Sequence, residues 1–246
     1  MARDFHDNTS LGPAEAAVVD HLRRRHFADV GVRFDPVPLL AELALQGAVP
    51  TPERQRAPTA GGWASVALRN RGGVAQASIE HDDEHRELPL SWTPLALRCP
   101  NLVAFLESLV DVSRCGPIHI MALMPSGIVE PHSDSPDRDV EVSLNLALAH
   151  PPGCVVRFAS DAATLRAGGG EAVPYTSGVA MLLNVAAWHT IDNPTASPRV
   201  HLVIRASHRS RAFEAQAPAW WAKLAASPKP RWHYGRGRRR APLLAG

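Results

Sequence analysis

Cysteine is scarce in this sequence, and its spacing excludes the sites that cysteine usually builds. The chain has 246 residues and three cysteines, Cys99, Cys115 and Cys154. An odd number of cysteines without a Cys-x-x-Cys pair argues against a disulfide scaffold and against a zinc ribbon. Free thiols are typical of a reducing compartment, so we expect a cytoplasmic protein.

Long apolar runs and a strong charge bias are also missing. No stretch approaches the length of a membrane span, and the first residues, MARDFHDNTSLG, lack the apolar region of a signal peptide. The formal net charge is +2, from 26 basic and 24 acidic side chains. One basic run, at residues 236–240, has the composition of a solvated tail rather than of a nucleic-acid patch. We therefore expect neither a membrane nor a nucleic acid as a partner, while the oligomeric state stays open.

Proline and glycine, by contrast, are plentiful, with 22 and 17 residues, which favours short strands joined by turns over a helical bundle. The apolar fraction of 45% and the charged fraction of 20% are ordinary for a soluble globular protein. A chain of this length supports one well-buried domain. We expect a single domain over residues 1–246, with a mixed, helix-containing part at 1–115, a β-rich core at 116–210 and a C-terminal segment with the basic tail at 211–246.

Three segments in the first half have the pattern of helices. Residues 13–25 start with a proline, which suits a first helical turn, and end in basic side chains, which suit a helix C-terminus. For the apolar run 37–46 we expect Asp35 as the N-cap and Pro36 as the first helical residue. Residues 100–113 repeat apolar side chains at helical spacing, as expected of a helix that packs on a sheet.

Two other segments of the first half have distinct patterns. Residues 63–70 alternate and include a β-branched side chain, which predicts a strand. Residues 80–88 are densely charged and contain His81 and His85, so a metal site is conceivable there. Because no apolar side chain would hold this cluster rigid, a solvated loop is the favoured interpretation.

From residue 116 onward the pattern changes to short strands separated by turns. Six or so strands within about ninety residues indicate a small barrel or sandwich. In 139–149 the apolar side chains alternate with Glu141, Ser143 and Asn145, and this polar face fits either a polar interior or solvent. The predicted strands are 118–124, 128–132, 139–149, 154–159, 179–184, 188–193 and 199–206.

A histidine and an aspartate two residues apart end one of these strands, in the run IVEPHSD. In extended backbone, side chains at i and i+2 point to the same face, so His132 and Asp134 can reach one metal ion. His189 follows another apolar strand and is a candidate third ligand, although a lone histidine there is more often structural. Two imidazoles and one carboxylate suit Fe(II), Mn(II), Co(II) or Zn(II), and they leave adjacent positions open, as in non-haem Fe(II) oxygenases.

An arginine lies ten positions after the last of these histidines, across the turn DNPTASP. That turn is long enough to reverse the chain, so Arg199 would start the neighbouring strand and could project into the same interior. A guanidinium binds a carboxylate through two parallel hydrogen bonds, which lysine cannot match. A dicarboxylate chelating the metal at one end and held by Arg199 at the other is chemically coherent. Arg199 alone could be a surface ion-pair residue, but the functional role is the favoured interpretation.

Taken with the runs WASVALRN, LSWTPLALRCPNLVAFLESL, VSLNLAL before PPGCVVRF, and WHTIDNPTASPRVHLVI, these residues resemble the aspartyl/asparaginyl β-hydroxylase-like family of Fe(II)/2-oxoglutarate dioxygenases. The bacterial proline cis-4-hydroxylase type is the most similar, and the resemblance extends from about Trp63 to Ser207. It implies a double-stranded β-helix, a jelly-roll or cupin-like barrel with flanking helices. It implies His132, Asp134 and His189 as iron ligands and Arg199 as the anchor of the distal carboxylate of 2-oxoglutarate. It also implies hydroxylation of an unactivated C–H bond by O2 with release of succinate and CO2.

One departure from the family pattern concerns the strand after the His-x-Asp pair. The family has Arg-x-His where this chain has Glu141-Val142-Ser143, so the pocket should be less cationic and could accept an amine or an amide. We expect an amino acid, an amino-acid-derived compound or a short peptide as substrate, with no catalytic residue beyond the metal ligands. Desaturation, or a cupin-like metal-binding barrel without oxygenase activity (a pseudo-enzyme, binding protein or isomerase), stays open. Candidate substrate contacts are Arg69, Glu141, Ser143, Asn145 and Trp188.

Overall fold

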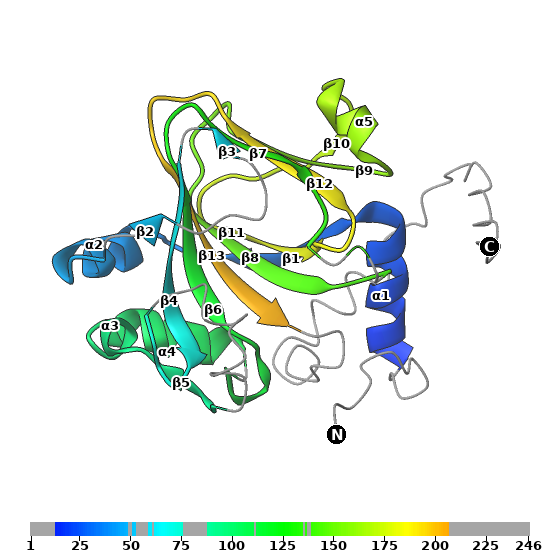
Figure 1. The fold of residues 1–246 in the computed structure, drawn as a ribbon. Helices are drawn as coiled ribbons and strands as arrows, with labels where there is room; N and C mark the ends of the chain where they lie inside the picture. The colour runs from blue at the N-terminus through cyan, green and yellow to red at the C-terminus, as the bar shows by residue number, and fades with distance from the viewer. Residues whose placement is uncertain are drawn as a thin grey trace, which may run out of the picture.

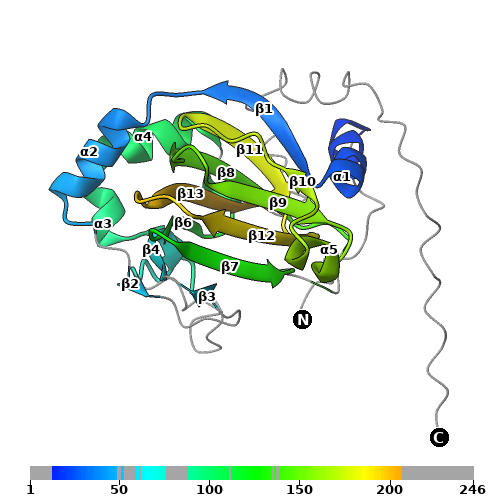
Figure 2. The same cartoon turned by 90° about the horizontal axis from the view of Figure 1, so that it is seen from above.

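The computed structural model describes residues 13–48, 51–52, 59–60, 62–75, 88–110, 112–134, 136 and 139–206. His81 and His85 of the charged stretch, and the basic C-terminal run, lie outside these residues. The strand pairs of the described part are antiparallel, and they form the two facing sheets seen in Figure 1 and Figure 2. No helix in this part is both long and apolar enough to cross a membrane.

The helices and strands follow one another along the chain with short connections. The helices are α1 (Pro13–Arg25), α2 (Val37–Leu45), α3 (Pro94–Leu97), α4 (Pro100–Leu109) and α5 (Ala162–Arg166), with a 3-10 turn at Val112–Arg114. The strands are β1 (Phe27–Arg33), β2 (Thr51–Pro52), β3 (Thr59–Ala60), β4 (Trp63–Arg71), β5 (Leu90–Trp92), β6 (Ile118–Leu123), β7 (Gly127–His132), β8 (Val142–Ala149), β9 (Val155–Ala159), β10 (Glu171–Ala172), β11 (Val179–Asn184), β12 (Trp188–Asn193) and β13 (Arg199–Ala206).

From β6 to β13 the chain crosses from one sheet to the other after every strand except β9, which pairs with β10 within the minor sheet. The major sheet has the order β1-β11-β8-β13-β6-β4-β2, with β5 paired to β4, and the minor sheet has the order β10-β9-β12-β7-β3. Along the chain β6, β8, β11 and β13 therefore fall in the major sheet, and β7, β9, β10 and β12 fall in the minor one. This winding is a double-stranded β-helix, which confirms the expected fold class. The strands β1, β4 and β5 of the first half extend the major sheet.

Strand β8 shows how the sequence pattern decides which side of the major sheet faces the helices. Its apolar residues belong to the larger hydrophobic cluster, on the face that packs against the helices. Ser143 and Asn145 alternate with them and are buried nonetheless, while Ala147 joins the smaller cluster, between the sheets. The polar face of β8 therefore lines the interior of the β-helix and not the solvent. The apolar residues of this strand and its approach are Val140, Val142, Leu144, Leu146 and Leu148.

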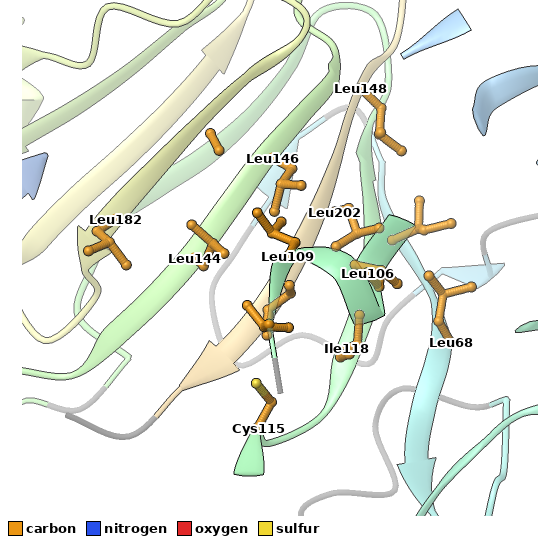
Figure 3. Packing of buried hydrophobic residues seen from close by; sticks show 14 of the residues in the cluster. Leu68, Leu106, Leu109, Cys115, Ile118, Leu144, Leu146, Leu148, Leu182 and Leu202 are labelled. Atoms are coloured by element: carbon orange, nitrogen blue, oxygen red, sulfur yellow. The ribbon is translucent and has the colours of Figure 1, made fainter. Parts of the chain in front are cut away.

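The larger hydrophobic cluster lies between the helices and the major sheet, and it contains most of the buried apolar side chains. Leu106 and Leu109 of α4 pack on side chains of the major sheet such as Leu144 and Leu202, as Figure 3 shows. Full burial of one leucine contributes about 1.5–3 kcal/mol, so the packing of α4 on the sheet stabilises the fold substantially. It leaves the opposite, inner face of the sheet free to carry polar side chains.

A glutamate from α2 fixes the start of α4. Glu42 Oε2 accepts the backbone N–H of Leu102 at 2.8 Å, and Oε1 accepts the backbone N–H of Asn101 at 3.1 Å. These donors have no partner within their own helix, and Cys99 at the N-cap provides no side-chain bond. The carboxylate therefore caps α4 from another helix and also complements its dipole.

Several boundaries differ from those expected from the sequence. Helix α2 begins at Val37 with Pro36 as its N-cap, and Asp35 Oδ1 accepts the N–H of Val37 at 3.0 Å from one residue further back. The helix expected at 100–113 ends at Leu109, where Val110 adopts an extended backbone. Strand β1 pairs with β11 and was not predicted, and neither were β10 and α5 near the glycine-rich stretch. The single-domain assignment of residues 1–246 stays a prediction.

Candidate metal centre and the polar interior

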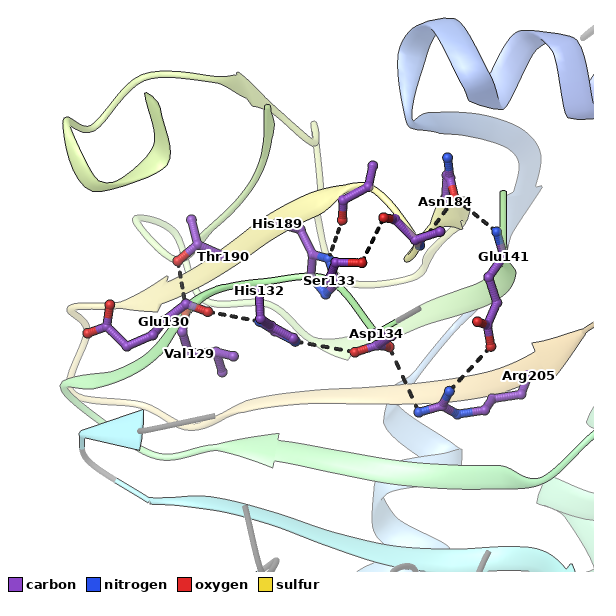
Figure 4. Close-up of polar contacts among 12 residues, drawn as sticks. Val129, Glu130, His132, Ser133, Asp134, Glu141, Asn184, His189, Thr190 and Arg205 are labelled. Carbon is purple, nitrogen blue, oxygen red and sulfur yellow. Dashed lines mark hydrogen bonds and ion pairs between the residues drawn. The ribbon is translucent and has the colours of Figure 1, made fainter. Parts of the chain in front are cut away.

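Two adjacent strands of the minor sheet bring His132 and His189 together. The two residues are direct partners in the antiparallel pair of β7 and β12, and their ring centroids lie 4.3 Å apart. Asp134 follows two residues after the end of this pair. One ligand atom from each of the three side chains lies within 4.8 Å of the other two, and Figure 4 shows them converging. The structure therefore gathers the three residues that were expected to bind a metal, although binding itself stays a prediction.

The backbone sets the orientation of both imidazoles. Nδ1 of His132 lies 2.8 Å from the carbonyl oxygen of Glu130, and Nδ1 of His189 lies 2.9 Å from that of Ala187. A carbonyl only accepts, so each Nδ1 carries a proton and donates it. In a neutral ring this leaves the lone pair on Nε2, which then faces the site, and such carbonyl contacts are typical of metal-binding histidines.

The space between His132 and Asp134 favours a cation. His132 Nε2 lies 3.3 Å from Asp134 Oδ1, and cis ligands about 2.1 Å from one metal lie about 3 Å apart. Although burial acts to raise it, the hydrogen bond from His132 and the neighbouring positive charges hold the pKa of Asp134 well below its usual range. Burial lowers the pKa of His132, but its bond to Asp134 raises it above its ordinary value overall. A proton is thus stabilised where a metal cation would bind, so the donor set fits such an ion.

His189 is the buried member of the group. Burial, and then repulsion from His132, lowers its pKa to about 4. Its ring packs 5.3 Å from that of Phe158 on β9. A neutral imidazole enclosed in this way is ready to act as a ligand without first losing a proton at neutral pH.

Backbone bonds hold the segment that carries Asp134. The N–H of Asp134 donates to the carbonyl of Val185 at 3.0 Å, and Ser133 Oγ donates to the carbonyl of Ala186 at 2.8 Å. Asn184, just before these two acceptors, is fully buried and accepts the N–H of Ala186 at 3.2 Å. The connection between β11 and β12 therefore positions the carboxylate, and it also leads directly into His189.

A charged pair borders the metal group on its exposed side. Arg205 Nη2 lies 3.8 Å from Asp134 Oδ2, and Arg205 Nη1 lies 3.6 Å from Glu141 Oε1, as drawn in Figure 4. The backbone N–H of Glu141 is held by Asn184 Oδ1 at 3.0 Å. In the register of β13 and β8, Arg205 is opposite Ser143. The neighbouring strand β13 thus places a cation beside Glu141, while the expectation of a pocket less cationic than in the family stays a prediction.

Arg199 lies at the other end of β13 and is among the largest fully buried side chains. Burial lowers the pKa of Arg199, while Tyr175 and Cys154 act to raise it. No carboxylate of the described residues is among the groups that shift this pKa. Nε of Arg199 and the hydroxyl of Tyr175 have no hydrogen-bond partner among these residues. A buried cation without a counter-ion is costly, so this end of the interior is suited to an anion. Arg199 is therefore not the surface ion-pair residue that the sequence left open.

Two histidines adjoin Arg199. Its Nη2 lies 2.9 Å from His201 Nδ1, and His201 Nε2 lies 3.0 Å from His150 Nδ1. Asn145 Oδ1 is placed 2.6 Å from the same His201 Nδ1. Burial and the charge of Arg199 lower the pKa of His150 to about 4 and the pKa of His201 well below its ordinary value.

The other expected contacts are placed differently. Arg69 donates to the carbonyl of Cys115 at 2.9 Å, so its guanidinium braces the connection that precedes β6. Trp188 is half-buried and, by strand alternation, lies on the opposite face of β12 from His189. Ser143 Oγ is buried on the inner face without a hydrogen-bond partner in the described part. Their roles as substrate contacts stay predictions.

Four residues of this interior were missed from the sequence. His201 and Arg205 share the inner face of β13 with Arg199, so period-two alternation could have found them. Tyr175 lies between β10 and β11, and His150 lies just after β8, so no local strand pattern marks either residue.

All three cysteines are buried and free.

The family model for aspartyl/asparaginyl β-hydroxylase matches residues 40–209. A crystal structure of a 2OG-Fe(II) oxygenase family oxidoreductase from Burkholderia pseudomallei is similar with a TM-score of 0.46 and 14% identity, covering 82% of this chain and 92% of the other. A Pseudomonas putida prolyl-4-hydroxylase gives 0.41 and 19%, covering 78% of this chain and 98% of the other. No curated protein matches. The chain belongs to the aspartyl/asparaginyl β-hydroxylase family of 2-oxoglutarate- and Fe(II)-dependent oxygenases.

Proposed function

We propose that this protein is a dioxygenase that hydroxylates an unactivated C–H bond of an amino acid or an amino-acid-derived compound, free, carrier-bound or within a short peptide. The observation that carries the proposal is the pairing of two sites in one interior. A group of two histidines and one carboxylate suits a divalent metal, and a buried arginine without a counter-ion suits an anion.

For the metal, we assign His132, Asp134 and His189 as the ligands of Fe(II). Three ligands of this kind leave adjacent coordination positions open for cosubstrate and O2. When bound, Fe(II) with 2-oxoglutarate and O2 would supply the oxidant for hydroxylation, with succinate and CO2 as coproducts. The chain's own contribution is to fix the two imidazoles through backbone carbonyls and the carboxylate through the β11–β12 connection.

For the cosubstrate, we assign Arg199 as the group that binds the distal carboxylate of 2-oxoglutarate. The unpartnered hydroxyl of Tyr175 is a second donor for the same carboxylate. Cys154, near Arg199, directly precedes β9, and Phe158 of β9, against His189, lies four residues further along the chain, which is about 13 Å in extended backbone. The side chains of Arg199 and His189 occupy part of this distance. A small dicarboxylate is therefore of a suitable size to link the metal ligands and Arg199.

For the substrate, we assign the charged pair Glu141 and Arg205. The two groups have opposite charge, are partly exposed and adjoin Asp134. Their spacing of 3.6 Å is longer than a tight charge-assisted hydrogen bond of about 2.8 Å. An ammonium would be attracted by Glu141 and a carboxylate by Arg205, and the unpartnered hydroxyl of Ser143 lies opposite Arg205 in the strand register.

The experiment that tests the proposal is an anaerobic titration of the Fe(II)-loaded protein with 2-oxoglutarate, monitored by the visible metal-to-ligand charge-transfer band. We expect a band that saturates, followed by succinate release when O2 and a panel of amino acids are added. The band should be absent from Asp134→Ala. Iron binding without a band would contradict cosubstrate chelation and would favour a metal-binding barrel without oxygenase activity.

A further inference from the structure

A continuous series of buried hydrogen bonds, called here the Arg199 file, starts at Arg199 and links two histidines to a backbone carbonyl. It passes from Arg199 Nη2 to His201 Nδ1 at 2.9 Å, and from His201 Nε2 to His150 Nδ1 at 3.0 Å. It ends where His150 Nε2 lies 3.0 Å from the carbonyl oxygen of Cys154. None of the side chains in the file is more than 8% exposed, so no bulk solvent competes for these bonds.

The two fixed ends of the file determine where each proton lies. A guanidinium only donates, and a carbonyl only accepts. If His201 Nδ1 accepts from Arg199, its proton is on Nε2 and donates to His150 Nδ1. The proton of His150 is then also on Nε2 and donates to Cys154. Every donor in this arrangement meets an acceptor, and both rings are neutral.

The opposite tautomers would let His201 Nδ1 donate to Asn145 Oδ1 at 2.6 Å, but they produce two mismatches elsewhere. A proton on His201 Nδ1 would face the N–H of the Arg199 guanidinium, donor against donor, at 2.9 Å. His150 would then donate from Nδ1, and its bare Nε2 would face the carbonyl of Cys154, acceptor against acceptor, at 3.0 Å. Each buried mismatch forfeits a hydrogen bond, so the first arrangement is preferred.

The same reasoning fixes the side-chain amide of Asn145. Only an N–H donor is compatible with His201 Nδ1 as an acceptor, so the amide nitrogen of Asn145 occupies the position 2.6 Å from that atom. The two atoms of such an amide are assigned from hydrogen bonds and not from shape. N–H groups of Arg199 and Asn145 then share the single lone pair of His201 Nδ1, and the ring is held on the inner face between β13 and β8.

From these contacts we infer that His201 is a positioning residue of the cosubstrate site, acting as the hydrogen-bond acceptor that fixes the plane of the Arg199 guanidinium, with His150 fixing the tautomer of His201. The inference rests on the role proposed above for Arg199. A guanidinium is planar, so one bond at Nη2, with the side chain enclosed, orients its remaining N–H groups, including the unpartnered Nε. Without this acceptor the fork that meets a carboxylate would be loosely aligned.

Substitutions at His201 test the inference through binding, without turnover. With Mn(II)-loaded protein, the Kd for 2-oxoglutarate is measured by calorimetry for wild type, His201→Leu, His201→Asn and Arg199→Met. Loss of one charge-assisted acceptor should raise the Kd of His201→Leu about 10- to 100-fold. Asn carries an oxygen close to the place of Nδ1, so His201→Asn should recover most of the affinity. The control His21→Leu removes a contact between His21 of α1 and the carbonyl oxygen of Phe27 in β1. This variant should bind 2-oxoglutarate with the wild-type Kd.

The outcomes separate the two proposals. An unchanged Kd in Arg199→Met would remove the anchor itself, and with it the proposed cosubstrate site. A large loss in Arg199→Met with a wild-type Kd in His201→Leu would overturn the positioning role alone, as would a His201→Asn variant no better than His201→Leu. In assays of succinate release, the positioning role predicts that His201→Leu raises the KM for 2-oxoglutarate by a larger factor than it lowers kcat.

A measurement on the unaltered protein covers the case in which the variants fail to fold. Nitrogen-15 NMR of the histidine rings distinguishes an Nε2-protonated from an Nδ1-protonated ring by the shifts of the two nitrogens. We expect both His150 and His201 as neutral Nε2–H tautomers at pH 7. An Nδ1–H tautomer for His201 would overturn the inference directly, since that ring cannot accept from Arg199.

Discussion

The two ends of the interior, the metal group and the Arg199 file, differ in how tightly their polar groups are held. At the metal end His132, Asp134 and Arg205 have side chains that are 26–30% exposed, and the ion pairs of Arg205 are 3.6–3.8 Å long. At the other end Arg199 is 2% and His201 0% exposed, with bonds of 2.9–3.0 Å. Groups that must exchange partners are accessible and loosely paired, while groups that must hold one orientation are enclosed and matched.

The two ends also have opposite electrostatic character. The metal end places a carboxylate beside an imidazole and stabilises a positive charge between them. The Arg199 end places a permanent cation among neutral groups, with no carboxylate contributing to its environment among the described residues. One end is therefore suited to a cation and the other to an anion, and a ligand that is negative at both ends would bridge a metal and the arginine.

The largest expected effect follows from removing one metal ligand. Asp134→Ala should abolish succinate release and lower the affinity for the metal by more than about 100-fold, since even residues behind the ligands contribute 10- to 100-fold. Metal content after dialysis and succinate assays measure both. The control Asp192→Ala removes an exposed carboxylate of the strand that carries His189 and should retain metal and activity. Full metal content in Asp134→Ala would contradict the assignment.

The next effect separates stability from binding at the other end. Arg199→Met removes a buried cation without a counter-ion, so the free energy of unfolding without ligand should stay the same or rise. Binding of 2-oxoglutarate should weaken by about 2–5 kcal/mol, or roughly 30- to several thousand-fold, because a buried charged partner is lost. Denaturation in urea with and without 2-oxoglutarate measures both quantities.

A surface arginine provides the contrast for this variant. Arg33→Met removes an exposed ion pair with Asp29 and should change unfolding by no more than about 1 kcal/mol, with unaltered ligand binding. A strongly destabilised Arg199→Met would mean that the cation has a structural role instead. The metal group and the Arg199 file would then differ in how they are packed and not in the charge of the ligand that each one binds.

What could be predicted from the sequence depended on how local the signal was. Alternation predicted the strands of the β-helix other than β10, and it separated the apolar face of β8 from the polar one, because side-chain period two is a local property. The His132-x-Asp134 pair, His189 and Arg199 could be named because each stands next to a predicted strand. The structure then brings the first three together.

The rest depended on contacts between segments far apart in the chain. Glu141 suggested a less cationic pocket, since nothing local shows that Arg205 of another strand faces it. Arg69 had the pattern of a strand residue near a pocket, but its guanidinium donates to the Cys115 carbonyl 46 residues away. Tyr175 meets His201 only through tertiary packing, and no short-range pattern contains that contact.

Acid should destabilise the Arg199 end through its neutral histidines. His150 has a pKa of about 4 in the folded protein, lowered by burial and by Arg199, against an ordinary value of 6.5. Between these values the unfolded state binds the proton first, so the free energy of unfolding falls as the pH falls from 6.5 to 4. The slope from this one group is at most about 1.4 kcal/mol per pH unit, and the contribution is fully present above pH 6.5.

Urea denaturation of the metal-free protein at several pH values measures this slope. His150→Asn lacks a titrating ring, so the difference in unfolding free energy between wild type and this variant should shrink as the pH falls through the same window. Groups whose folded pKa is lowered independently of His150, such as His189, cancel in that difference. A difference that is constant from pH 7 to pH 4 would mean that His150 is already charged beside Arg199.

The smallest effect concerns a part of the molecule remote from both ends. Glu42 caps α4 by accepting the N–H groups of Asn101 and Leu102, so Glu42→Ala should lower the free energy of unfolding by about 1 kcal/mol, the usual value of a lost N-terminal cap. The control Glu107→Ala, exposed on α4 itself, should have almost no effect. Neither variant should change the affinity for metal or 2-oxoglutarate, because α4 packs on the outer face of the major sheet. If Glu42→Ala weakened ligand binding in proportion to stability, the losses of affinity expected at Asp134, Arg199 and His201 could come from a general destabilisation of the fold. Unaltered binding in Glu42→Ala would attribute those losses to the metal group and to the Arg199 file.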